Sequence, residues 1–182
     1  MTLPPPGVAV ILVTLVLIAA VYDVRFRRIP NWLTVSGVVV GLALNTFLFP
    51  VWPGLKIALV GFAVAFGVYF ILYALHAMGA GDAKLMAGVG ALVGWQDWFG
   101  IFILTAILGG MIALIALLFR KRLMSTVFNV GFILSEMKSG RAAYKSREDL
   151  DVRSPTSFGL PHGAVIAVGT IFFLAISAHY VR

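Results

Sequence analysis

The chain has 182 residues, of which 61% are hydrophobic and only 12% are charged. Water-soluble domains carry about a quarter charged residues, so this composition excludes an ordinary soluble domain and predicts an all-α polytopic membrane protein. The net charge of +7 points to basic cytoplasmic loops rather than to a nucleic-acid partner, and the absence of cysteine excludes disulfides and thiol catalysis.

Six apolar segments follow one another along the chain. The first has no basic residue before it and no clear cleavage site, so we expect a retained span whose N-terminus lies outside. The fourth is too short to cross comfortably, because the hydrocarbon core needs about 20 helical residues. The segments lie at approximately 6–22, 32–50, 55–77, 83–95, 98–119 and 160–181.

The basic residues indicate whether segment 83–95 crosses the lipid bilayer. If all six segments cross, twelve of the fourteen Lys and Arg residues lie on one side, and only Lys56 and Arg182 lie on the other. If it does not cross, the basic loop at about 120–158 lies opposite Arg25–Arg28, which breaks the positive-inside rule. We therefore predict one domain, residues 1–182, built as a bundle of six transmembrane helices with both termini outside.

This topology makes two further predictions. The 120–158 loop is cytoplasmic, and apolar residues at helical spacing within it indicate a possible interfacial helix at about 123–137. Trp52, Trp95 and Trp98 are expected at the outer interface, where aromatic residues are enriched.

Two acidic residues stand out, because an ionisable group at membrane depth marks a functional site by default. Four of the seven acids belong to the 120–158 loop, and Asp97 falls in the short outer turn. Asp23 ends the first span and Asp82 begins the fourth. The predicted topology places both carboxyl groups at the same cytoplasmic boundary.

Each aspartate alone also has an ordinary structural explanation. Asp82 closes the sequence Gly79-Ala80-Gly81-Asp82 and suits the N-cap of a helix that starts at Ala83. Asp23 precedes three arginines and suits an ion pair at a helix end. The two glycines allow an unusual turn, or a substrate strand beside the acid.

The two motifs together are more specific than either alone. A span ending in Asp23, a basic turn closed by Ile29-Pro30-Asn31, two further spans and then Gly-Ala-Gly-Asp-Ala-Lys-Leu follow in that order. This arrangement resembles the type IV prepilin peptidases, bacterial intramembrane aspartyl proteases with a Gly-x-Gly-Asp signature. The sequence Leu160-Pro161-His162-Gly163 is similar to the Pro-aromatic-Gly element common in that family, with His162 in place of the aromatic residue.

The resemblance implies that Asp23 and Asp82 are the catalytic acids of an endopeptidase that needs no metal or cofactor. Its substrate would be a prepilin or pseudopilin, cut between a basic leader and an apolar helix at the cytoplasmic face of the bacterial inner membrane. The chain is most similar in outline to the short, peptidase-only form of tight-adherence (Flp-type) pilus systems. Methylation of the new N-terminus is not expected, since the paired cysteines of larger members are missing.

Other residues near the aspartates receive secondary roles. Gly79 and Gly81 would give the substrate backbone access to Asp82. Lys84 either tunes the local charge or extends to the lipid headgroups. Pro30 and Asn31 start the second span, with Pro fixing φ and Asn capping the helix.

Two alternatives from other functional classes stay open. A small proton- or cation-coupled transporter would use the same acids as ion sites, but it favours acids near the bilayer midplane and matching inverted halves. A non-catalytic scaffold for pilus assembly would keep the fold without the chemistry. The sequence does not indicate the oligomeric state.

Overall fold

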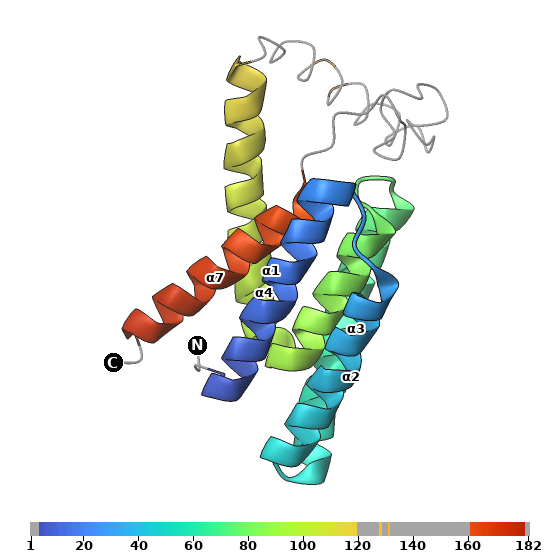
Figure 1. Ribbon diagram of the computed structural model, residues 1–182, viewed down its shortest axis with the longest axis vertical. Helices are drawn as coiled ribbons and strands as arrows, with labels where there is room; N and C mark the ends of the chain where they lie inside the picture. The colour runs from blue at the N-terminus through green and yellow to red at the C-terminus, as the bar shows by residue number, and fades with distance from the viewer. Residues whose placement is uncertain (1–3, 120–127, 129–130, 132–160, 181–182) are drawn as a thin grey trace.

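The computed structural model describes residues 4–119, 128, 131 and 161–180 (Figure 1). No strand occurs among these residues, which confirms the all-α fold class. The predicted loop at 120–158 and its helix at 123–137 lie outside the described residues, except for the isolated positions 128 and 131. The helices are α1 (Pro6–Phe26), α2 (Asn31–Leu48), α3 (Val51–Ala74), α4 (Ala80–Phe119) and α7 (His162–Tyr180).

All five helices are long and apolar enough to cross a membrane, from 18 residues in α2 to 40 in α4. Large apolar side chains also cover much of the outer surface, including Phe47 and Phe119, each 86% exposed. Contiguous apolar surface of this extent is rare on water-soluble monomers. The chain is therefore a multi-pass membrane protein.

Helix α4 consists of two helical segments joined at Gly94, where φ is 79° and ψ is 170°. Only glycine adopts this conformation readily, and a Cβ there would also approach Cγ2 of Ile57 to 2.9 Å. The first segment runs down the bundle and the second returns upward beside α7 (Figure 1). Phe173 of α7 packs against Gly100, and Val165 packs against Gly109, so α7 runs antiparallel to the second segment.

The predicted count of six spans is not confirmed: in the described part of the chain five helices are long and apolar enough to cross, and segments 83–95 and 98–119 correspond to the two parts of α4 on either side of Gly94. The first α4 segment ends at Val93 and is only about 20 Å long at 1.5 Å per residue. In Figure 1 the turn between the two segments of α4 lies above the lower ends of α2 and α3. The number of membrane crossings and the location of the termini stay predictions.

The depth of this turn explains where the nearby aromatic residues lie. Trp52 and Trp95 are 80% and 48% exposed, in keeping with an interfacial location. The expectation for Trp98 is wrong, because Trp98 is fully buried and stacks on Phe102 with ring centroids 5.4 Å apart. Asp97 beside it is only 8% exposed. Residues after a turn inside the bundle are covered by neighbouring helices.

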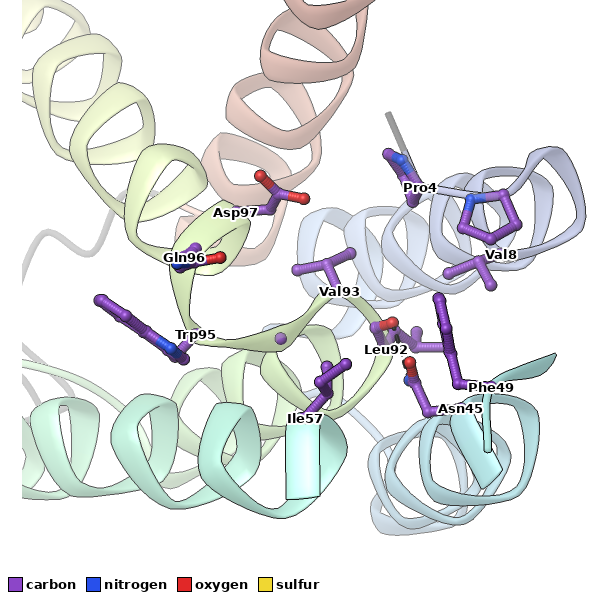
Figure 2. A pocket seen from close by; sticks show the side chains of 12 residues that line it. Pro4, Val8, Asn45, Phe49, Ile57, Leu92, Val93, Trp95, Gln96 and Asp97 are labelled. Atoms are coloured by element: carbon purple, nitrogen blue, oxygen red, sulfur yellow. Dashed lines mark hydrogen bonds between the residues drawn. The ribbon is translucent and has the colours of Figure 1, made fainter. Parts of the chain in front are cut away.

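Asn45 of α2 lies next to the interruption and satisfies carbonyl groups that the turn leaves without partners (Figure 2). Its Nδ2 group donates to the carbonyl oxygens of Ala91 and Leu92, at 2.9 and 3.1 Å, and to that of Gly41 at 3.0 Å. The last carbonyl groups of a helical segment receive no N–H donor from the helix itself, and lipid offers no donors. Asn45 therefore stabilises the end of the first α4 segment.

Helix α3 and the first α4 segment pack at backbone distance. A Cβ on Gly61 would fall on the carbonyl oxygen of Gly90, and a Cβ on Gly90 would fall on that of Gly61. Small residues allow such approach in membranes, where helices associate by packing rather than by the hydrophobic effect. This contact fixes the position of α4 along α3, and with it the position of Asp82.

We predict that Asn45→Leu, which keeps the branching and the number of heavy atoms of the side chain but removes the donor, lowers the free energy of unfolding by about 1–2 kcal/mol. Circular dichroism during SDS titration in detergent micelles measures the change. Thr46→Val is the control, because the Thr46 hydroxyl donates to the Leu42 carbonyl of its own helix. An Asn45→Leu variant as stable as the native protein contradicts the role given to Asn45.

Candidate active site

A pocket of about 480 Å³ lies at the end of the bundle where α1 ends and α4 begins. Asp23 and Asp82 both line this aspartate pocket, so the structure brings together the two carboxyl groups that the charge distribution placed on one side. The rest of the lining comes from the α1–α2 turn and the start of α4. These residues are Arg27, Arg28, Ile29, Pro30, Asn31, Ala80, Gly81 and Lys84.

Asp23 lies in the last turn of α1 and is 8% exposed. Its Oδ2 atom accepts a hydrogen bond from the backbone N–H of Gly163 at 2.7 Å. Gly163 is in the first turn of α7, where N–H groups have no intrahelical acceptor and the helix dipole favours a negative charge. The Asp23 carboxyl group therefore accepts a hydrogen bond from the first turn of α7 and stabilises the start of that helix.

Asp82 lies in the first turn of α4, three positions after Gly79. Its Oδ2 atom accepts the N–H of Gly79 at 3.2 Å, which is half of a capping box. The expected N-cap position is wrong in detail, because α4 begins at Ala80 and not at Ala83. Asp82 caps the helix from inside its first turn, and its Oδ1 atom takes no part in this hydrogen bond.

Ile29 closes one side of the pocket, a role that its position in the Ile29-Pro30-Asn31 turn does not indicate. Its side chain is 9% exposed and lies against two glycines from distant parts of the chain. A Cβ on Gly81 would be 3.3 Å from Cβ of Ile29, and a Cβ on Gly163 would be 3.2 Å from its Cδ1. The starts of α4 and α7 therefore both reach the α1–α2 turn only because these positions have no side chain.

The two glycines of the Gly-Ala-Gly-Asp motif have different surroundings. Gly81 lines the aspartate pocket, but the face where its side chain would be is filled by Ile29. Gly79 does not line the pocket and instead donates its N–H to Asp82. Close packing and capping are thus the contacts that these glycines make, and the access of a substrate backbone beside them stays a prediction.

Lys84, Pro30 and Asn31 lie together at the wall of the pocket. Lys84 Nζ donates a hydrogen bond to Oδ1 of Asn31 at 2.8 Å, which links α4 to α2. Pro30 occupies the N-cap of α2 with φ of −64°, as predicted, but no side chain caps this helix. The capping role expected for Asn31 is therefore wrong, because its side chain binds Lys84 instead.

The pocket contains three cationic side chains, Arg27, Arg28 and Lys84, beside its two acids. Arg27 ends α1 in the left-handed conformation, with φ of 53°, and its N–H donates to the carbonyl oxygen of Asp23 at 2.9 Å. Charge compensation of Asp23 by the arginines is compatible with this arrangement. Within residues 4–119 and 161–180, no group of three or more His, Asp and Glu side chains is arranged to hold a metal ion.

His162 packs as a ring at the start of α7. Its centroid lies 6.4 Å from that of Tyr69, a residue of α3 that is 1% exposed. Its Nε2 atom is buried and has no hydrogen-bond partner in the described part of the chain. The contact with Tyr69 is one that an aromatic side chain also makes, which explains how histidine fits at this position.

Comparisons with known proteins identify the family. A sequence profile described as the type IV leader peptidase family matches residues 10–114, which include both aspartates. The preflagellin peptidase of Methanocaldococcus jannaschii is 38% identical over 80 residues, which cover 42% of this chain and 34% of the relative. The prepilin leader peptidase/N-methyltransferase of Klebsiella pneumoniae is 35% identical over 101 residues, which cover 50% of this chain and 44% of the relative. The enzyme of the same name from Escherichia coli is 31% identical over 118 residues, which cover 62% of this chain and 52% of the relative.

The matched residues thus span between 34% and 52% of the length of these three relatives. No solved structure matches the chain at a significant level. The profile covers more than half of the chain, from α1 into the second segment of α4. The protein therefore belongs to the type IV leader peptidase family.

Proposed function

We propose that this protein is a membrane-embedded aspartyl endopeptidase that removes the basic leader from prepilin-type substrates, with Asp23 and Asp82 as its catalytic pair. The observation that carries the proposal is that both carboxyl groups line one pocket, although they belong to different helices. Family membership and the names of the relatives support the reaction class. The methyl transfer named for some relatives is not part of the proposal.

The local geometry supports this chemistry. Each carboxyl group is held through Oδ2 by a backbone N–H, from Gly163 for Asp23 and from Gly79 for Asp82. Backbone donors fixed by helix starts keep both side chains in place without occupying Oδ1. Catalytic groups need such preorganisation, because a small misplacement reduces the rate strongly.

Two carboxyl groups in one small pocket disfavour simultaneous ionisation, so the active pair holds one shared proton. The ionised carboxylate takes a proton from a water molecule whose oxygen attacks the scissile carbonyl carbon. The protonated carboxyl group hydrogen-bonds the developing oxyanion and then transfers its proton to the leaving amine as the C–N bond breaks. The pair works as a unit, and neither role is assigned to Asp23 or to Asp82 individually.

The charge distribution supports a pocket at the cytoplasmic face of a bacterial inner membrane. Residues 4–119 and 161–180 contain five Lys and Arg residues, and four of them, Arg25, Arg27, Arg28 and Lys84, belong to the end of the bundle that holds the pocket. The fifth, Lys56, is near the start of α3 at the other end. Lys and Arg concentrate on the cytoplasmic side of membrane proteins. A substrate with a basic leader before an apolar helix would present its junction at this level.

We predict that Asp23→Asn and Asp82→Asn each lower the cleavage rate by at least about 100-fold, because neither amide can exchange the proton. The assay uses purified protein in detergent and a synthetic peptide with a basic leader and an apolar helix, followed by gel mobility. Asp97→Asn is the matched control, because Asp97 is as buried as Asp23, 8% exposed, but lies near Gly94. Cleavage at the native rate by either active-site variant would disprove the pair.

A second prediction concerns Gly163 as a positioning residue. Gly163→Ala keeps the N–H group but places a Cβ 3.0 Å from Cβ of Asp23 and 3.1 Å from its Oδ2, so the carboxyl group must shift. We expect kcat to fall about 10- to 100-fold while KM and the helical content stay near native values. Gly67→Ala is the control, because nothing lies within 4 Å of a Cβ there. A native kcat for Gly163→Ala would show that this contact does not position Asp23.

A further inference from the structure

A second, apolar groove lies between α2, α3 and the first segment of α4. Its volume is about 270 Å³ and its walls are formed by aliphatic and aromatic side chains. The groove is open to the surroundings, since three of its lining side chains are exposed: Val35 and Val39 are each 57% exposed, and Phe66 is 36% exposed. Its lining includes Val35, Val38, Val39, Phe62, Phe66 and Lys84.

The groove is adjacent to the aspartate pocket, because Lys84 lines both. The Lys84 ammonium group donates to Asn31, which belongs to the aspartate pocket alone. A lysine stem packs along apolar surface while its charged end remains among polar groups. Lys84 therefore marks the boundary between the aspartate pocket, which holds both acids, and the apolar groove beside it.

The groove runs from this boundary along α2, away from the pocket. Val35, Val38 and Val39 follow Asn31 at helical spacing, so they form a stripe on one face of α2. Phe62 and Phe66 of α3 form the facing wall, with ring centroids 5.8 Å apart and nearly parallel planes. Thr34 is also in the lining, but its hydroxyl donates to the Asn31 carbonyl at 3.0 Å, so its polar group is satisfied inside the protein.

We infer that this groove binds the apolar helix of the substrate, so that the peptide bond before that helix lies in the aspartate pocket. The inference rests on the proposed function. A peptide cut between the two acids continues on both sides of the cut, and at Lys84 the polar lining of the aspartate pocket meets the apolar lining of the groove. An apolar helix fits the groove and not the charged walls of the pocket, because charged walls would leave its side chains without apolar contacts. Lipid chains are the competing occupant.

Two experiments test the groove, and the first of them does not depend on catalysis. The native chain has no cysteine, so Val39→Cys provides a single reactive site in the groove and Val10→Cys, on the 65% exposed Val10 of α1, a single control site. The cysteines are combined with Asp82→Asn and oxidised with a peptide that has a basic leader and one cysteine in the first two turns of its apolar helix. We expect a mixed disulfide with Val39→Cys and none with Val10→Cys.

The second experiment fills the groove in the otherwise native protein. Val39→Trp should raise KM for the full peptide about tenfold with little change in kcat, because bulk at this wall displaces the substrate helix. Val10→Trp should leave both parameters unchanged. A truncated peptide that ends at the first turn of the helix should be cut equally by the native protein and by Val39→Trp.

The outcomes separate the groove from the proposed function. If the native protein cleaves the peptide but Val39→Trp has a native KM and the disulfide forms equally at Val10→Cys, the groove holds lipid only and the inference is overturned. If the native protein does not cleave the peptide but the disulfide still forms only at Val39→Cys, the helix-binding groove stands and the proposed function fails. Neither cleavage nor a disulfide at Val39→Cys would overturn both.

Discussion

The hydrogen bond from the Gly163 N–H to the Asp23 carboxyl group, 2.7 Å long, joins the last helix to the first. It satisfies an N–H of the first turn of α7 and an oxygen of a buried acid at once, in a lipid setting where an unsatisfied polar group is costly. Helix α7 also packs along the second segment of α4 through Phe173 and Gly100. The position of Asp23 therefore depends on the whole bundle, although the residue itself belongs to α1.

Asp82 depends in the same way on contacts between backbones. Gly81 lets the start of α4 reach Ile29, and the Gly61–Gly90 contact fixes α4 along α3. The interruption at Gly94 ends the first segment early, and Asn45 provides donors for the carbonyl groups left there. Helices in lipid gain little from apolar burial against one another, so close packing and complete hydrogen bonding determine where a side chain is held. Small residues at these positions are thus part of the construction of the aspartate pocket.

The arrangement also joins two environments at one point. The aspartate pocket is lined by charged and polar groups, whereas the neighbouring groove is lined almost entirely by apolar side chains. Lys84 lines both, and its ammonium group donates to Asn31 of the aspartate pocket. A reaction at the junction of a polar peptide and an apolar helix requires both environments within a few ångströms, because each part of such a substrate is stable only in its own surroundings.

The sequence by itself determined the helical fold class, the membrane setting and the placement of Asp23 and Asp82 at one end of the bundle. Composition and the distribution of Lys and Arg carry that information, because they reflect the solvent that each segment meets. Only the tertiary structure decided that Trp98 is buried, that Asn31 binds Lys84 rather than capping α2, and that Ile29 fills the face of Gly81. These outcomes depend on which helices approach at backbone distance and where a helix is interrupted. Such contacts join residues far apart in the chain, and no local spacing in the sequence records them.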